Sequence, residues 1–184
     1  MAATSPETAL GTPAPDFSLP ATDGRTIRLS DVAGASGTVV AFICNHCPYV
    51  VSAARRIVAD ARALAADGVG FVAICSNDAV AYPADSFDRM KAFAASHDFP
   101  FPYLHDESQA VARAYGAVCT PDFFGFDRDL RLAYRGRMDG GGTSQPKPDA
   151  PRELLEAMRA VARGGRAPDR QMPAVGCSIK WKAA

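Results

Sequence analysis

The sequence predicts an α/β fold in which a mixed central sheet is flanked by helices. Two continuous apolar runs, residues 38–44 and 69–76, have the length and character of buried parallel strands. Each run is followed by a segment whose apolar residues recur at helical spacing. Two more short strands, 122–127 and 130–135, are separated by only a tight turn, which is typical of an antiparallel pair.

The remaining elements follow in chain order. Residues 16–29 carry two strand-like pieces around a turn at Asp23-Gly24, which predicts a short N-terminal hairpin. From Pro48 to about Asp67 the small and apolar residues share one helical face, and Gly68 is expected to end that helix. Further segments are predicted as helices over 85–97, 107–115 and 151–163, as an extended piece over 101–104, and as a loop rich in Gly and Pro over 139–150.

The chain of 184 residues is long enough for one domain with a single core. We predict a flexible lead-in over 1–13, where small residues, polar residues and prolines dominate, and the folded domain over 14–163. The last residues, 164–184, are expected to form an irregular C-terminal tail that packs back on the domain, because the tail contains the single tryptophan, Trp181.

Composition and charge argue against several classes of partner. Hydrophobic residues make up 48% of the chain and charged residues 22%, and 20 Lys plus Arg balance 20 Asp plus Glu. A neutral chain has no general attraction to nucleic acid or to an anionic membrane, so we expect neither as a partner. No apolar run approaches the ~18 residues of a membrane span, and the first residues lack a secretory signal pattern. We therefore expect a cytoplasmic protein, whose five cysteines are not a disulfide scaffold.

The motif Cys-Asn-His-Cys-Pro, from Cys44 to Pro48, indicates thiol chemistry. Proline favours the first position of a helix, so Pro48 makes Cys47 the N-cap residue and leaves Cys44 at the end of the preceding strand. A free cysteine with a pKa of about 8.5 is only about 3% ionised at pH 7, and the unpaired N–H groups of a first helical turn stabilise its thiolate. We therefore predict that Cys47 is the nucleophile.

Cys44 is the expected partner of this nucleophile. Residues three apart in a turn have Cα atoms within about 7 Å, near the range of a disulfide, so Cys44 is expected to resolve a mixed disulfide on Cys47. His46 either stabilises the thiolate when protonated or is simply exposed. The alternatives are half of a zinc site, although no second cysteine pair has the usual spacing, and two buried cysteines without function.

From about Leu10 to Arg163 the sequence resembles the thioredoxin-like superfamily. The opening Leu-Gly-Thr-Pro-Ala-Pro-Asp-Phe-Ser-Leu-Pro resembles that of peroxiredoxins and thioredoxin-like reductases, and the run from Val39 to Cys47 has the spacing of their nucleophile strand. The segment Tyr-Gly-Ala-Val-Cys-Thr-Pro, ending at Pro121, is similar to the loop that carries the superfamily's cis-proline. More narrowly, Cys-Asn-His-Cys-Pro-Tyr-Val and Gly-Cys-Ser-Ile-Lys-Trp resemble a peroxiredoxin-like subgroup of AhpC/TSA-type redoxins.

This resemblance implies a thioredoxin-like fold with Pro121 opposite the active site. A proline cannot donate a ladder hydrogen bond, so Pro121 is expected to end strand pairing and leave the Thr120 backbone free for an extended substrate. The alternative is an ordinary turn proline. Whether the bond between Thr120 and Pro121 is cis stays open in the sequence.

The sequence also departs from the families that it resembles. Thioredoxins carry the second cysteine inside the helix, where this chain has Val50, and peroxiredoxins have Thr or Ser at the position of Cys44. The peroxiredoxin arginine that polarises peroxide falls at Pro121 in this register, although Arg135 or Arg137 remain possible substitutes. These departures favour thiol–disulfide exchange over fast peroxide reduction.

The other three cysteines have different expected roles. Cys119 lies two residues before Pro121, and it is either a second resolving thiol or a packed one. Cys75, in a buried strand, is expected to be part of the core. Cys177 either belongs to a tail that covers the active site and supplies a resolving thiol, or sits in a tail pinned by Ile179 and Trp181.

The sequence therefore predicts a thiol-based oxidoreductase of antioxidant type, with Cys47 as nucleophile. Its expected partners are a disulfide or peroxide substrate and an external thiol reductant of the thioredoxin or glutathione type. No cofactor and no metal are predicted, and the oligomeric state is open. One alternative is a peroxiredoxin-type peroxidase. Another is a non-enzymatic metal-binding or redox-sensing module that uses Cys44, His46, Cys47 and Cys177.

Overall fold

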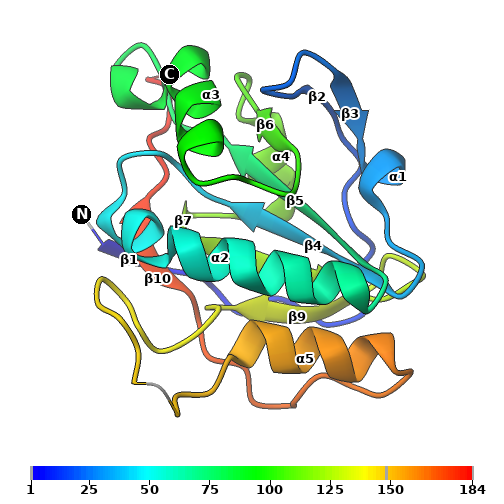
Figure 1. Cartoon of the computed structure of the whole chain (residues 1–184). Coiled ribbons are helices and arrows are strands. Elements are labelled where there is room, and N and C mark those ends of the chain that lie inside the picture. The colour runs from blue at the N-terminus through cyan, green and yellow to red at the C-terminus, as the bar shows by residue number, and fades with distance from the viewer. Residues whose placement is uncertain (1, 148, 184) are drawn as a thin grey trace.

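A five-stranded mixed sheet forms the centre of the protein, as the sequence predicts (Figure 1). The computed structural model describes residues 2–147 and 149–183. The strands lie side by side in the order β6-β5-β4-β8-β9. Their bounds are β4 (Gly37–Phe42), β5 (Val69–Cys75), β6 (Tyr103–His105), β8 (Asp122–Phe126) and β9 (Leu132–Gly136).

The first half of this sheet is parallel and the second half is antiparallel. Strands β4, β5 and β6 pair in parallel, and β4 pairs antiparallel with β8, which pairs antiparallel with β9. All six residues of β4 are buried, because this strand is central and is covered on both faces. The carboxyl ends of β4 and β5 therefore lie at the same edge of the sheet, which is where ligands gather in such folds.

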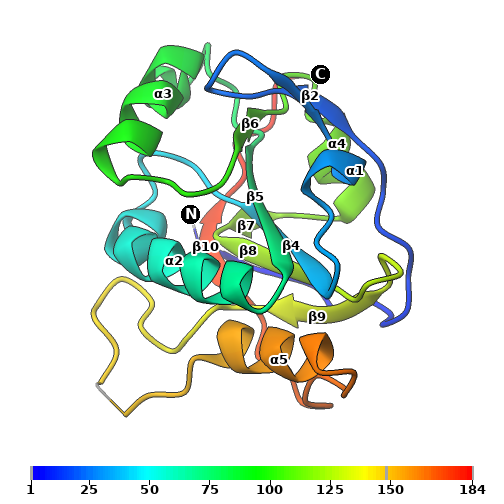
Figure 2. The ribbon, with the colours of Figure 1, turned by 45° about the vertical axis from the view of Figure 1, so that its right-hand side comes forward.

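Helices cover both faces of the sheet (Figures 1 and 2). The helices are α1 (Leu29–Val32), α2 (Pro48–Ala66), α3 (Phe87–Ser96), α4 (Ala110–Tyr115) and α5 (Glu153–Ala162), with a 3-10 turn η1 (Pro83–Asp85) before α3. Successive residues of β4 point to opposite faces, so Val39 packs with α2 and α5 while Val40 packs with α4 and the hairpin. The hairpin consists of β2 (Ser18–Pro20) and β3 (Thr26–Arg28).

The long helix α2 begins and ends where the sequence predicts. Pro48 occupies its first turn, Cys47 is its N-cap, and Gly68 follows its last turn with a φ of +76° that favours glycine. The structure adds the short helix α1 and the turn η1, which the sequence analysis did not anticipate.

A second, three-stranded sheet joins the two ends of the chain. It consists of β1 (Ala2–Thr4), β10 (Val175–Ser178) and β7 (Cys119–Thr120), in the order β1-β10-β7. These strands differ from the predicted flexible lead-in over 1–13 and the predicted irregular tail. Their short sequences have no alternating apolar pattern, so pairing between segments far apart in the chain creates them. In Figures 1 and 2 this sheet lies beside the N-terminal end of α2.

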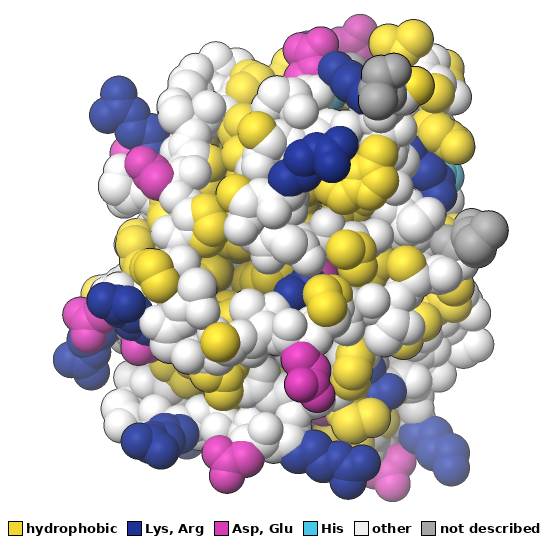
Figure 3. All heavy atoms as spheres, turned by 180° about the vertical axis from the view of Figure 1, so that it is seen from behind, with side chains coloured by type: hydrophobic (Ala, Val, Ile, Leu, Met, Phe, Trp, Pro, Cys, Tyr) yellow, Lys and Arg dark blue, Asp and Glu magenta, His cyan; other side chains and the backbone are white. Residues whose placement is uncertain are grey.

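The surface carries both signs of charge. Figure 3 shows one face, on which Lys and Arg side chains are interspersed with Asp and Glu side chains. Among the described helices, none is long and apolar enough to cross a membrane.

The packing of α5 on the sheet provides a test of the fold. Leu154 is 0% exposed within the core between α2, α5 and the sheet. We predict that Leu154→Ala lowers the free energy of unfolding by about 2–5 kcal/mol, because it removes buried methyl groups and leaves a cavity. Arg163→Ala, at an exposed position after the same helix, is the matched control and should change it by less than about 0.5 kcal/mol. Urea denaturation measures both, and equal effects would contradict this view of the core.

Candidate active site

Cys47 lies where the central strand passes into the long helix. Strand β4 ends at Phe42, and a five-residue connection brings the chain to Cys47, the N-cap of α2. The backbone carbonyl of Cys47 accepts the first helical hydrogen bond, from the Val51 N–H at 2.9 Å. The Cys47 side chain is 0% exposed, so its sulfur faces the interior of the site.

Cys44 and Thr120 surround this sulfur. Cys44 is also 0% exposed, and its Sγ lies 3.4 Å from the Thr120 Oγ1. The thiol form of Cys47 donates to the Thr120 carbonyl at 3.1 Å. The bond between Thr120 and Pro121 is cis. Thr120 therefore contacts both cysteines of the motif, one through its side chain and one through its backbone.

The surroundings of Cys47 stabilise its thiolate. A hydrogen bond from the Cys44 thiol is the largest influence and lowers the pKa of Cys47 well below its ordinary value, against the opposing effect of burial. The Val50 N–H, in the first turn of α2, and Cys177 lower this pKa further. The Thr120 carbonyl acts in the opposite sense, because it favours the thiol that donates to it. The net effect is a lowered pKa of Cys47, which favours the thiolate more than in an ordinary cysteine.

The same hydrogen bond has the opposite effect on Cys44. Donating to Cys47, together with burial, raises the pKa of the Cys44 thiol far above its ordinary value. Cys44 is therefore a proton donor to the Cys47 sulfur in the reduced protein. This division of roles agrees with the sequence-based choice of Cys47 as the nucleophile, although the choice itself stays a prediction.

The tail strand occupies the edge that we expected to be open to substrate. Strand β10 pairs antiparallel with β7, which places Cys177 opposite Thr120 and Ser178 opposite Cys119. The expectation of a free Thr120 backbone is therefore wrong for this conformation. The reason is Gly176, where an added Cβ would lie only 1.9 Å from the Thr120 carbonyl oxygen, so only glycine permits this approach.

Cys177 thus lies next to the nucleophile. It is half-buried, and burial, followed by the effect of the neighbouring Cys47, raises its pKa to about 11. The tail is also pinned beyond this point, because Ile179 is buried and Trp181 stacks with Arg113 at 4.3 Å. The tail therefore lies beside the site and is also pinned beyond it, and a resolving role for Cys177 stays a prediction.

Cys119 and Cys75 are packed. Cys119 is 0% exposed, and its Sγ lies 3.9 Å from the carbonyl oxygens of Pro121 and Ala174. Burial raises the pKa of both thiols to about 12. Cys75 is part of the core under α2, as predicted.

Neither candidate arginine is free to polarise a peroxide at Cys47. The Arg135 guanidinium is 3.0 Å from Asp122, 2.7 Å from the Gly116 carbonyl and bonded to Thr8. Arg137 forms a bidentate pair with Glu153 at 2.7 and 2.8 Å. Both side chains are engaged with residues of the scaffold.

His46 lies against a buried carboxylate, Asp85, that the sequence did not suggest. Its Nδ1 lies 2.7 Å from the Asp85 Oδ2, and its ring stacks on Tyr82 at 5.9 Å. Asp85 is 0% exposed and belongs to η1, about forty residues along the chain. Only tertiary structure brings it to the site, and no local pattern marks it.

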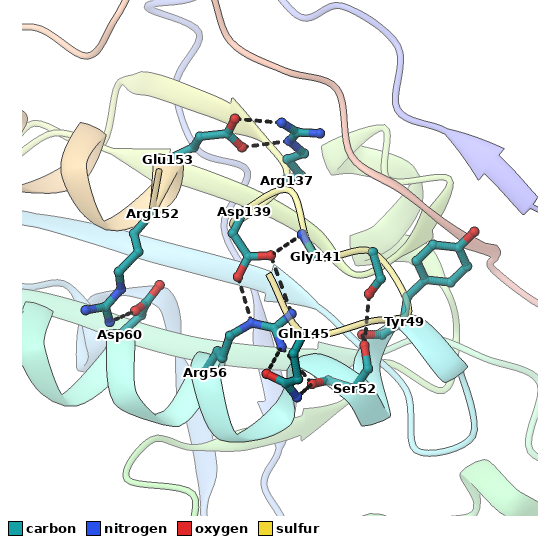
Figure 4. A network of polar contacts seen from close by, with 11 residues as sticks. Tyr49, Ser52, Arg56, Asp60, Arg137, Asp139, Gly141, Gln145, Arg152 and Glu153 are labelled. Atoms are coloured by element: carbon teal, nitrogen blue, oxygen red, sulfur yellow. Dashed lines mark hydrogen bonds and ion pairs between the residues drawn. The ribbon is translucent and has the colours of Figure 1, made fainter. Parts of the chain in front are cut away.

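A small pocket of about 190 Å³ opens beside Pro121. It lies between the start of α2, the loop after β9 and Val175 of the tail strand. Figure 4 shows the polar network that holds this loop on α2. Arg56 binds Asp139 at 2.7 Å and Gln145 at 3.0 Å, and Ser52 donates to the Gly142 carbonyl at 2.9 Å. The network makes this wall of the site part of the scaffold.

Comparisons with known proteins place the chain among redoxins. The AhpC/TSA family model matches residues 10–135. No curated protein matches the sequence. An uncharacterized conserved protein from Geobacillus kaustophilus is 45% identical, with a TM-score of 0.95. The match covers 100% of this chain and 98% of that chain.

Two further solved structures extend the comparison. A hypothetical protein from Sinorhizobium meliloti is 40% identical, with a TM-score of 0.91. The match covers 98% of this chain and 99% of that chain. The thioredoxin domain of a thiol-disulfide oxidoreductase from Bacteroides vulgatus is 15% identical, with a TM-score of 0.59. The match covers 70% of this chain and 89% of that chain. The last similarity establishes the fold alone, and it confirms the predicted thioredoxin-like architecture.

The ionisation of Cys47 is the first property of the site to test. We predict that a thiolate absorbing in the ultraviolet persists at mildly acidic pH, where a free cysteine is protonated, and disappears in Cys47→Ser. Cys44→Ala removes the strongest donor and should raise the pKa of Cys47 by about 1–2, since a hydrogen bond to a charged group contributes about 1.5–3 kcal/mol. Cys75→Ala is the matched control. A Cys47 that ionises no more readily than glutathione would refute this electrostatic account.

The fit of the tail strand can be tested at Gly176. We predict that Gly176→Ala displaces β10 from β7 and exposes Cys47, because the new Cβ collides with the Thr120 carbonyl. The rate of Cys47 alkylation by iodoacetamide should rise on the order of tenfold, which corresponds to about 1.4 kcal/mol of lost strand pairing. Val175→Ala, at an exposed position of the same strand, should leave the rate near that of the wild type. An unchanged rate in Gly176→Ala would show that the strand does not limit access.

Proposed function

Because this chain belongs to the AhpC/TSA family, we propose that it is a thiol-based oxidoreductase whose nucleophile is Cys47. The observation that carries the proposal is a buried Cys47 at the N-cap of α2, with Cys44 three residues before it and Cys177 of the tail paired opposite Thr120, whose carbonyl the Cys47 sulfur contacts. A thiolate with a second thiol in contact has the two groups that disulfide exchange needs.

The reaction that fits this arrangement is thiol–disulfide exchange. The Cys47 thiolate attacks one sulfur of a disulfide substrate, forming a mixed disulfide and releasing the other sulfur as a thiolate. A neighbouring cysteine, after losing its proton to solvent or to the released thiolate, then attacks the Cys47 sulfur and releases the second substrate thiol. The substrate gains two electrons, and the protein is left with an internal disulfide. An external thiol reductant, of the thioredoxin or glutathione type, restores the two thiols.

Two cysteines are placed to resolve the mixed disulfide, and access to the site favours Cys44. An extended substrate reaches the backbone of Thr120 beside Pro121 only after β10 leaves β7, and Cys177 leaves with that strand. Cys44 stays, because it belongs to the connection between β4 and α2. We therefore assign resolution to Cys44 for substrates that displace the tail. Cys177 serves only small substrates that enter with the tail in place, and the packed Cys119 takes no part.

A peroxiredoxin-type peroxidase is the second candidate, and the family match favours it. In that reaction the Cys47 thiolate attacks one oxygen of a hydroperoxide, becomes a sulfenic acid and releases an alcohol or water. The chemistry requires a donor to the breaking bond, yet Arg135 and Arg137 are held by Asp122 and Glu153. Missing one such donor typically costs about 10²–10³ in rate, so we rank peroxide below disulfide as substrate.

The proposal predicts distinct outcomes for the individual cysteines. Cys47→Ser should reduce insulin-disulfide turnover to background, and Cys44→Ser should accumulate a mixed disulfide between Cys47 and an insulin chain, because a substrate of this size displaces the tail together with Cys177. Peptide mass mapping locates each bond. Cys75→Ala, at a core position on β5, should retain turnover.

Stopped-flow oxidation by hydrogen peroxide separates the two candidates. A rate near that of free cysteine supports exchange, whereas a rate several powers of ten higher supports the peroxidase. Full turnover in Cys47→Ser with both substrates would exclude both candidates.

A further inference from the structure

Three metal-ligating groups converge where the connection between β4 and α2 meets η1. The Cys44 Sγ, the His46 Nδ1 and a carboxylate oxygen of Asp85 all lie within 4.8 Å of one another. Cys44 and His46 come from the connection between β4 and α2, whereas Asp85 comes from η1. The fold therefore brings together a sulfur, a nitrogen and an oxygen ligand from two separate segments.

Asp85 is a buried carboxylate with unusual partners. It is 0% exposed, its Oδ1 accepts the Asn45 N–H at 2.8 Å, and its Oδ2 accepts the Asn77 side chain at 2.7 Å. Among residues 2–147 and 149–183, no Lys or Arg forms an ion pair with it, and the charged-type contact that it makes is with His46. Buried carboxylates are generally paired with a cation or coordinate a metal.

His46 is held with one ring nitrogen aimed at this carboxylate. The ring is nearly parallel to Tyr82, with an angle of 3° and centroids 5.9 Å apart. Nδ1 is buried and lies 2.7 Å from the Asp85 Oδ2, yet the contact lacks the geometry of a hydrogen bond. The side chain is 31% exposed, so the ring also provides a path from solvent to the cluster.

We propose that Cys44, His46 and Asp85 form a Zn²⁺ site. A thiolate, an imidazole and a carboxylate are the three ligand types that zinc takes in proteins, and water completes a tetrahedral set. The thiolate and the imidazole make Mg²⁺ and Ca²⁺ poor candidates. Small movements of the three side chains bring the ligand atoms to zinc distances. Asn45 and Asn77, which hold Asp85, supply the supporting shell that orients ligands at metal sites.

The site differs from the metal module that the sequence allowed. That module used Cys47 and Cys177 beside Cys44 and His46, whereas the structure replaces those two thiols with Asp85. It also departs from the expectation that no metal binds. The consequence for catalysis rests on the proposed function, in which Cys44 resolves mixed disulfides. The Cys44 sulfur cannot bind Zn²⁺ and form a disulfide with Cys47 at the same time, so the two states exclude each other.

Zn²⁺ itself is the probe. Reduced full-length protein, freed of metal by chelator and desalted, is titrated with Zn²⁺ in competition with a chromophoric chelator. We expect one Zn²⁺ per chain, with His46→Ala and Asp85→Asn each weakening binding by at least about 10-fold, a loss that is typical even of groups that only orient a metal ligand. His97→Ala, a half-buried histidine at the end of α3, is the matched control and should bind as the wild type does. Cys177→Ser should also bind normally.

Co²⁺ provides a second readout, because a thiolate–cobalt charge-transfer band should appear in the wild type and vanish in Cys44→Ala. Circular dichroism verifies that each variant is folded. If Asp85→Asn does not fold because Asp85 is buried, His46→Ala still tests the site, since His46 is partly exposed. Absence of stoichiometric Zn²⁺, or binding that survives in His46→Ala but is lost in Cys177→Ser, would overturn the site. Disulfide turnover by the metal-free protein is measured separately, so failure of the metal site and failure of the proposed redox function are distinguishable.

Discussion

The central physical constraint on the site is the stabilisation of the Cys47 thiolate out of contact with solvent. Cys47 is fully buried, and burial alone favours the neutral thiol. The anion is favoured because separate parts of the fold direct donors at it: Cys44 from the preceding connection, the Val50 N–H from α2 and Cys177 from the tail. The same hydrogen bond that lowers the pKa of Cys47 raises the pKa of Cys44, so one contact makes one thiol a nucleophile and the other its proton donor.

The tail completes this environment, and it does so through a glycine. Gly176 lets β10 approach the Thr120 carbonyl so closely that any side chain at this position would collide with it. The tail thereby covers the edge beside the cis-proline and brings Cys177 to the nucleophile. The contact between β10 and β1, at the opposite end of the chain, ties the cover to the N-terminus. Access to Cys47 and the set of thiols around it are consequently controlled by the same strand.

Cys44 has two different sets of neighbours. One is Cys47, and the other is the pair of His46 and Asp85. His46 is adjacent to the nucleophile in sequence, yet its ring is directed to Asp85 and stacked on Tyr82. Adjacency in the chain is thus a poor guide to which groups act on a given sulfur, because neighbouring side chains in a turn point in different directions.

The sequence alone determined the alternation of strands and helices, the start of α2 at Pro48 and the position of Cys47 at its N-cap. Hydrophobic periodicity and the fixed φ of proline are local properties, and they do not depend on the rest of the chain. Tertiary structure decided the pairing of β10 with β7, the engagement of Arg135 and Arg137, and the arrival of Asp85 beside Cys44. These features join segments separated by tens of residues, and the interactions that create them exist only once the sheet has brought those segments together.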